Sequence, residues 1–245
     1  MLLYHGTSHS SAILCLKEGI KPRGVLKRSR GNWGHTISSN SKAVYLTNSY
    51  AVYFANAASR GSDKLAILEV DTDLLGLYGS MCLVPDEDAI EQSGRGRDGV
   101  PGDIVKRTAF FRRRLSGYFG TDQWELSLEL LGNCAFLGTI PPKAISRMAV
   151  IDIKKAIEFC MVAIDPVIVI KNQKIVGAKY RAITRWLFDG NSCLDEVEAT
   201  LSDFDKIING NVFPWLRGLS REGIDVVDIN KPDFDVAFVG RALIK

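Results

Sequence analysis

The chain has 245 residues, of which 46% are hydrophobic and 24% are charged, so it can bury a sizeable core and is not intrinsically disordered. Its formal net charge of +3 at pH 7 is too small to require a polyanionic partner. The N-terminus lacks the basic start and apolar run of a secretion signal, and the most apolar stretch, 161–170, is interrupted by Asp165 and Pro166. We therefore expect a cytoplasmic protein without a membrane span.

The five cysteines are scattered through the chain, and no two of them have Cys-x-x-Cys spacing. An odd, scattered set indicates neither a disulfide framework nor a zinc site, so the sequence predicts no metal and a reducing compartment. The cysteines are Cys15, Cys82, Cys134, Cys160 and Cys193.

The first predicted element is a short strand over residues 2–4, which runs directly into His5-Gly6-Thr7. Serines within 8–11 offer N-caps for a helix, and that helix ends at Gly19, a residue type typical of a left-handed C-cap. The pattern therefore places His5 and Gly6 at the end of a strand, where functional groups are often displayed.

Residues 22–41 show no apolar periodicity and are rich in glycine, serine and basic residues, so we expect a surface loop. A strand over 43–47 follows and carries Tyr45. The next predicted element is a helix over 49–58, which carries Tyr53.

Residues 65–71 predict a buried, central strand, whereas 78–122 has a weak pattern and is interpreted as an insertion. Its glycine-rich segment, 94–99, resembles a phosphate-binding loop but lacks the preceding strand and following helix, so we discard that reading. The end of the insertion interleaves basic and aromatic residues, which suits a single-stranded nucleic acid and a plain amphipathic helix equally. These residues are Arg107, Phe110, Phe111, Arg112, Arg113, Arg114 and Tyr118.

Residues 145–153 predict the closing strand of the sheet, and 154–245 predict a mainly helical C-terminal extension. Its expected elements are a helix over 154–163, a hairpin from 167–170 and 174–176, and helices over 178–188 and 193–208. The extension carries no chemistry that we can name, so partner recognition or target selection is its expected use.

Three segments carry a family resemblance when they are taken in this order: Tyr4-His5-Gly6-Thr7, then Val44-Tyr45-Leu46-Thr47 with the helix after it, then a segment ending in Ile140-Pro141-Pro142. They resemble the ADP-ribosyltransferases of the His-Tyr-Glu class, which includes diphtheria toxin and the poly(ADP-ribose) polymerases. The resemblance implies an α+β fold with a split, mostly antiparallel sheet in a catalytic domain of residues 1–153, interrupted by the insertion and followed by the extension.

The resemblance also implies that NAD is bound as a substrate, and it assigns roles to matching residues. His5 would hold the ribose hydroxyls on the adenosine side, and the Gly6 backbone would pair with the nicotinamide amide. The rings of Tyr45 and Tyr53 would enclose the nicotinamide. The expected cofactor-binding set is completed by Thr7, Thr47 and Arg23.

In the family, the loop that corresponds to residues 22–41 covers the bound NAD. Here it carries Arg23, Trp33 and His35 as candidate contacts. Arg23 is favoured because a guanidinium pairs well with a pyrophosphate.

The third segment departs from the family pattern at the catalytic glutamate. Related enzymes have this glutamate a few residues before the Ile-Pro-Pro turn, where the present chain has Ala135. Two explanations stay open: Glu129 or Glu125 supplies the carboxylate, or an alanine has replaced a native glutamate and the chain is an inactivated variant. We favour the second.

We therefore expect NAD-dependent mono-ADP-ribosyl transfer to a macromolecule, with nucleic acid preferred to protein as acceptor, by an intracellular toxin or antiphage effector that an antitoxin protein could control. The transferred bond breaks through an oxocarbenium-like transition state, which a carboxylate at the ribose 2′-hydroxyl stabilises. One alternative is an RNA 2′-phosphotransferase, disfavoured because the second segment lacks the histidine which that family prefers. Another is a catalytically dead module that binds NAD or nucleic acid.

Overall fold

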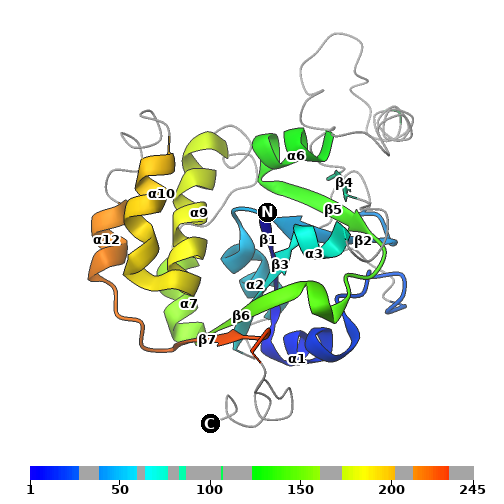
Figure 1. Ribbon diagram of the computed structural model, residues 1–245, viewed down its shortest axis with the longest axis horizontal. Helices are drawn as coiled ribbons and strands as arrows, with labels where there is room; N and C mark the ends of the chain where they lie inside the picture. Colours follow the sequence, from blue (N-terminus) through cyan, green and yellow to red (C-terminus); the bar gives the residue numbers. More distant parts are fainter. Residues whose placement is uncertain are drawn as a thin grey trace.

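The computed structural model describes residues 1–27, 39–59, 64–76, 83–86, 106, 123–160, 173–201 and 212–231. Within these ranges the protein is an α+β fold built on one seven-stranded sheet with the strand order β4-β5-β2-β1-β3-β6-β7, and the pairs in it are antiparallel (Figure 1). The strands are β1 (Leu2–Ser8), β2 (Ala43–Thr47), β3 (Leu65–Asp71), β4 (Leu83–Pro85), β5 (Asn133–Leu137), β6 (Ile145–Ile151) and β7 (Ile224–Asp228).

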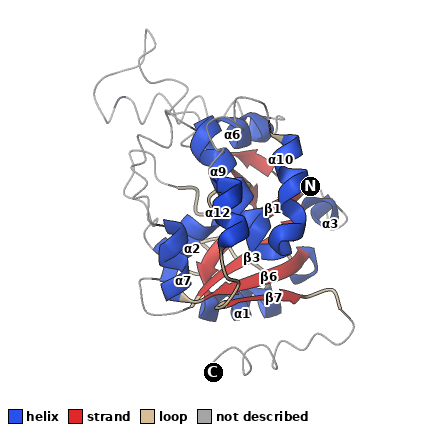
Figure 2. Cartoon of the chain, turned by 90° about the vertical axis from the view of Figure 1, so that its left-hand side faces the viewer, coloured by secondary structure: helices blue, strands red, loops and turns tan. Residues whose placement is uncertain are grey.

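Helices lie on both sides of the sheet (Figure 2). The helices are α1 (His9–Glu18), α2 (Ala51–Ser59), α3 (Thr72–Gly76), α6 (Gln123–Leu131), α7 (Ile153–Cys160), α9 (Gln173–Asp189), α10 (Leu194–Thr200) and α12 (Val212–Gly218), with 3-10 turns η1 (Pro142–Ala144) and η2 (Gly190–Cys193). None of the helices in these ranges is both long and apolar enough to cross a membrane.

The interior strand β3 separates two apolar cores. Leu65 and Ile67 pack into a core with side chains of α2, α7, α9, α10 and α12, whereas Ala66 and Leu68 pack into a second core with side chains of α1, α3 and α6. Successive strand residues point to opposite faces, so a strand covered on both sides must be apolar at every position. The strand predicted over residues 65–71 is buried, as expected, and it lies inside the sheet between β1 and β6, although the middle strand of the seven is β1.

The first helix begins and ends as its sequence predicts. The Ser8 hydroxyl accepts a hydrogen bond from the Ser11 amide at 3.3 Å, which satisfies a free N–H group at the helix start. At the other end Gly19 has a φ of 84° and donates its N–H to the Cys15 carbonyl. A Cβ on Gly19 would also lie 2.4 Å from the Ile140 carbonyl oxygen, so the site requires glycine twice over.

The strand before that helix is longer than predicted. We expected His5 and Gly6 at the end of a strand over residues 2–4, but β1 continues to Ser8. The reason is tertiary: β1 pairs with β3 from Leu2 to Ser8, and this pairing overrides the weak strand preference of glycine. His5 and Gly6 therefore lie in the middle of a strand.

The C-terminal extension differs from the prediction in two places. Residues 174–176, expected as one strand of a hairpin, lie inside α9, and residues 167–170 lie outside the described ranges. The strand β6 was expected to close the sheet, but it is not the edge strand. Residues 224–228 of β7 pair with residues 147–151 of β6, so β7 forms the edge. Among the described residues the extension is mainly helical, as predicted, but it also supplies the edge strand and shares a core with α2.

The helices predicted over 49–58, 154–163, 178–188 and 193–208 correspond to α2, α7, α9 and α10, with α9 five residues longer at its start. Residues 161–163 and 202–208 lie outside the described ranges, as does most of the predicted insertion over 78–122.

Candidate functional site

The sheet is divided between β1 and β2. Among the described residues these strands pair at one position, Tyr4 with Thr47, whereas β1 pairs with β3 at seven positions and β2 pairs with β5 at five. We call β4, β5 and β2 the three-strand half and β1, β3, β6 and β7 the four-strand half. Beyond Tyr4 and Thr47 the two halves are no longer joined as neighbouring strands, and His5 and Tyr45 lie on the two sides of this split.

The His5 side chain bridges the split. Its Nδ1 lies 3.0 Å from the Tyr45 carbonyl oxygen. A carbonyl oxygen only accepts, so Nδ1 carries the proton and Nε2 retains a lone pair. Burial lowers the pKa of His5, although the hydrogen bond to the Tyr45 carbonyl acts in the opposite direction. The imidazole is therefore neutral at pH 7 and has a hydrogen-bond acceptor at Nε2.

Gly6 lies under the backbone of α2. A Cβ on Gly6 would lie 2.2 Å from the Ala51 carbonyl oxygen and 2.5 Å from the Ala55 nitrogen. A side chain of any size would push the helix away from the strand. Whatever else Gly6 does, its first role is to let α2 approach β1.

The side chain of Tyr45 is fixed by contacts within the three-strand half and the segment before it. Its Oη accepts a hydrogen bond from the Asn40 amide at 2.6 Å, which ties it to the end of the preceding loop. Its half-buried ring packs with Ala43, Val84 and Ala135. The ring is therefore fixed at its hydroxyl and along its side.

Ala135 stands directly opposite Tyr45 in the pairing of β2 with β5 and opposite Val84 in the pairing of β5 with β4. It is 1% exposed. The position at which the family pattern expects a glutamate is thus a strand position beside Tyr45, filled by a methyl group.

Glu129 and Glu125 do not share that position. Both are exposed residues of α6, the helix that precedes β5, so neither lies on the strand that pairs with Tyr45. The structure brings Ala135, Tyr45 and His5 together across the split and leaves these two carboxylates on a helix surface.

The remaining expected contacts have protein partners. The Thr47 hydroxyl donates to the Gly132 carbonyl at 2.6 Å and accepts from the amides of Ser49 and Tyr50, so it fixes the turn into α2. The Arg23 guanidinium donates to the Ser39 carbonyl at 2.6 Å. These contacts show structural roles, and binding of NAD by either residue stays a prediction.

Thr7 lies on β1 and Tyr53 lies on α2. Thr7 is a buried residue of β1 that pairs with Ala66, and Tyr53 is a half-buried residue of α2 whose ring meets Phe54 edge-on at 5.7 Å. Tyr53 packs against the core on the α2 face. Trp33, His35 and the basic and aromatic residues of 107–118 lie outside the described ranges.

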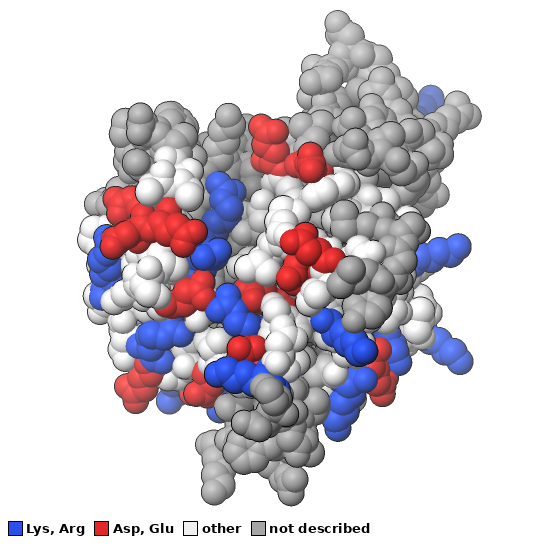
Figure 3. Space-filling model, in the orientation of Figure 1, with Lys and Arg blue, Asp and Glu red and all other residues white. Residues whose placement is uncertain are grey.

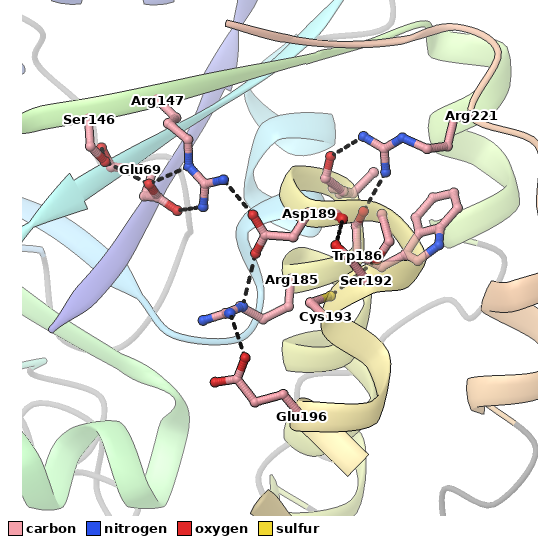
Figure 4. A network of polar contacts seen from close by, with 12 residues as sticks. Glu69, Ser146, Arg147, Arg185, Trp186, Asp189, Ser192, Cys193, Glu196 and Arg221 are labelled. Atoms are coloured by element: carbon pink, nitrogen blue, oxygen red, sulfur yellow. Dashed lines mark hydrogen bonds and ion pairs between the residues drawn. The ribbon is translucent and has the colours of Figure 1, made fainter. Parts of the chain in front are cut away.

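A buried charged cluster on the four-strand half was not predicted from the sequence (Figure 4). Glu69 is 2% exposed, and both of its carboxylate oxygens accept from the Arg147 guanidinium, at 2.8 and 2.6 Å. Ser146 adds a third hydrogen bond at 2.7 Å, and Arg147 also donates to Asp189 at the end of α9. One signal was present in the sequence, since a glutamate inside an otherwise apolar central strand needs a buried partner.

Two aromatic side chains, Phe188 and Tyr4, lie beside this cluster. Arg147 lies over the Phe188 ring at 5.0 Å, and the ring of Tyr4 stacks on the same Phe188 at 5.4 Å. Hydrogen bonds to Glu69 raise the pKa of Arg147, so its charge is permanent. Burial, with the charge of Glu69 as the second cause, raises the pKa of Tyr4, which stays a neutral phenol. The cluster is fully paired and has no reactive member, so it is a structural feature.

In the described part of the chain, histidine, cysteine and carboxylate side chains do not gather in a group of three or more that could hold a metal ion. Comparison of the chain with protein-family models gives no match, and comparison with curated proteins gives none either.

Proposed function

We propose that the split between β1 and β2 is a binding site for NAD and that the chain belongs functionally with ADP-ribosyl-transferring proteins. The observation that carries the proposal is the position of His5, Tyr45 and Ala135, three motif positions more than 35 residues apart in sequence, on adjoining strands around one split. The family resemblance implies a split sheet. The single residue pair that joins β1 to β2, Tyr4 with Thr47, supports that expectation.

The state of His5 suits a ribose contact. A neutral imidazole with Nε2 free of a proton can accept a hydrogen bond from a ribose hydroxyl, while Nδ1 keeps the ring in place through Tyr45. The ring of Tyr45, held by Asn40 and Ala135, would support the flat nicotinamide. Fixed groups of this kind lower a barrier chiefly by positioning when the leaving group is already good.

The chain as it stands lacks a carboxylate at position 135. Cleavage of the nicotinamide–ribose bond develops positive charge on the sugar, and a carboxylate beside the ribose 2′-hydroxyl stabilises that charge. With Ala135 in its place, the site keeps its binding groups and loses this stabilisation. We therefore infer that the chain binds NAD and turns it over poorly, either as an inactivated variant or as a binding module.

A second candidate function, a catalytically dead module, is favoured by the packing around Ala135. Ala43, Val84 and Ala135 form a small closed cluster on one face of the three-strand half, which leaves little room for a longer side chain. A natural alanine would be consistent with that close packing.

Nucleic acid is our preferred acceptor, in keeping with an intracellular toxin or antiphage effector. Support comes from three segments beside β2 that are joined by backbone hydrogen bonds, Ile20 with Ile140, Gly24 with Ser41 and Gly138 with Lys42. Basic residues outnumber acidic ones in these segments, and four of the basic residues are exposed; Figure 3 shows basic side chains, with acidic ones among them, around α1. Phosphate binding depends on such groups. The basic residues are Lys17, Lys21, Arg23, Lys27, Lys42 and Lys143, against Glu18.

The test is incubation of the wild-type chain, Ala135→Glu and Ala135→Gln with NAD labelled in its adenylate phosphate, together with cell extract. Label is then measured separately in protein, RNA and DNA. We expect transfer by Ala135→Glu, predominantly to nucleic acid, and little by the wild type or by Ala135→Gln, which matches the glutamate in size but not in charge. Label from Ala135→Glu in protein alone would overturn the acceptor preference, and no transfer by any form would favour the binding module.

A further inference from the structure

We infer that α9, from the C-terminal extension, is a brace that joins the two halves of the sheet, and that Thr184 is a positioning residue for the split between His5 and Tyr45. The inference rests on the proposed function only for its consequence for NAD. Its structural part stands on contacts between described residues.

The first contact of α9 is with the four-strand half. Asp189, the last residue of the helix, accepts from Arg147 on β6, and Arg147 holds both carboxylate oxygens of Glu69 on β3 (Figure 4). Arg221, in the segment before β7, donates to the carbonyls of Trp186 and Leu187 near the same helix end. The C-terminal end of α9 is therefore fixed to β3, β6 and the start of β7.

The second contact of α9 is with the end of β2. The Thr184 hydroxyl donates to the Ser49 carbonyl at 3.1 Å, and both residues are fully buried. Arg181, one turn earlier, donates to the Ser49 hydroxyl at 3.3 Å. Ser49 follows β2 by two residues, and its amide donates to Thr47, the residue of β2 that pairs with β1.

These contacts place the brace on one side of a pivot and the candidate site on the other. The pivot is the pair of Tyr4 with Thr47, with Ser49 beyond it in one direction and Tyr45 in the other. Thr184 and Asp189 are five residues apart on one helix, about 7.5 Å along its axis. A rotation of one half against the other would break the hydrogen bond of Thr184 or the ion pair of Asp189.

The helix α2 provides a second restraint, because its backbone meets Gly6 on the other side of the pivot. Since α2 begins two residues after Ser49, the hydrogen bond from Thr184 also fixes where α2 starts. The two restraints together set the distance between His5 and Tyr45. The C-terminal extension thereby has a use that the sequence did not indicate, which is to position the split.

The test compares Thr184→Val, which keeps the shape of the side chain and removes its donor, with Thr72→Val. Thr72 is the matched control: it is buried, and its hydroxyl donates to the Met1 carbonyl at 2.9 Å within the four-strand half. The readout is the nitrogen NMR spectrum of the His5 imidazole, which reports its tautomer and needs no NAD. Thermal melting establishes that each variant folds cooperatively.

We expect Thr184→Val to give a mixture of His5 tautomers and a weakened hydrogen bond to Tyr45, while Thr72→Val and the conservative Thr184→Ser keep the wild-type spectrum. Should Thr184→Val fail to fold, Arg181→Met gives the same comparison at a half-buried position, with a smaller expected change. A wild-type His5 spectrum in both variants, or an equal change in Thr72→Val, would overturn the brace.

For NAD, we expect an affinity about fivefold weaker in Thr184→Val, which corresponds to one ordinary hydrogen bond, and unchanged in Thr72→Val. An altered His5 spectrum together with no NAD binding by the wild type would overturn the proposed function and leave the brace standing.

Discussion

Ala135 on β5 is the cross-strand partner of Tyr45 on β2, and the two side chains pack in one cluster with Ala43 and Val84. A side chain longer than alanine at position 135 would therefore emerge beside the Tyr45 ring. The packing around position 135 therefore determines two things: which groups a carboxylate at that position could contact, and how much stability the fold would lose.

The variant Ala135→Glu should be less stable than the wild type by about 2 kcal/mol, because it introduces a polar group at a position that is 1% exposed. Chemical denaturation of both proteins measures the difference in the free energy of unfolding. Ala135→Gln should lose a similar amount. If Ala135→Glu were as stable as the wild type, the position would have more room than the packing indicates.

The close approach of α2 to β1 makes Gly6 intolerant of any side chain. Gly6→Ala should lower the free energy of unfolding by about 3 kcal/mol, because its Cβ would overlap two backbone atoms of α2 that cannot move independently. Gly218→Ala is the control, since a Cβ there meets no atom within 4 Å. Denaturant midpoints of the two variants give the comparison, and equal midpoints would show that α2 can shift without cost.

Much of the architecture could be predicted from sequence because its signals are local. The cap at Ser8, the stop at Gly19 and the apolar run of β3 each indicate an element without reference to the rest of the chain. The strand β1 was predicted too short because its second half is held by pairing with β3, which no local pattern shows.

The C-terminal part shows the same limit. Residues 174–176 have the β-branched composition of a strand, but they are the first turn of an amphipathic helix that packs on α10 and α12. In the site, motif order predicted that His5, Tyr45 and Ala135 lie near one another. The role of Thr184 depends on contacts across 135 positions of sequence and had no local signal.

The lowered pKa of His5 predicts a pH dependence of stability. The folded-state pKa lies below the ordinary value of 6.5. In the window between the two values the unfolded chain binds more protons, so stability falls as the pH is lowered below about 6.5. Each unit by which the pKa is lowered contributes about 1.4 kcal/mol.

The measurement is the free energy of unfolding between pH 5 and pH 8 for the wild type and for His5→Gln. The other histidines contribute equally to both proteins, so the difference between the two curves reports His5. We expect this difference to change below about pH 6.5 and to be constant above it. Parallel curves over the whole range would contradict a lowered pKa of the half-buried His5.

The ion pair of Arg147 with Glu69 should show the signature of a buried charge. Arg147→Met leaves Glu69 buried without its main partner and should cost about 3–5 kcal/mol. The double variant Glu69→Leu with Arg147→Met should be more stable than Arg147→Met alone. Arg217→Met is the surface control: its pairs with Asp195 and Glu198 are exposed and should be worth less than about 1 kcal/mol. Similar losses in both single variants would contradict the buried arrangement.

Binding of NAD in the split between β1 and β2 can be measured by calorimetric titration of NAD into the wild-type chain. We expect saturable binding of one NAD per chain, weakened at least tenfold in His5→Gln and unchanged in Arg217→Met. Absence of saturable binding up to about 1 mM, the upper end of ordinary enzyme–substrate affinities, or equal affinity in wild type and His5→Gln, would contradict it.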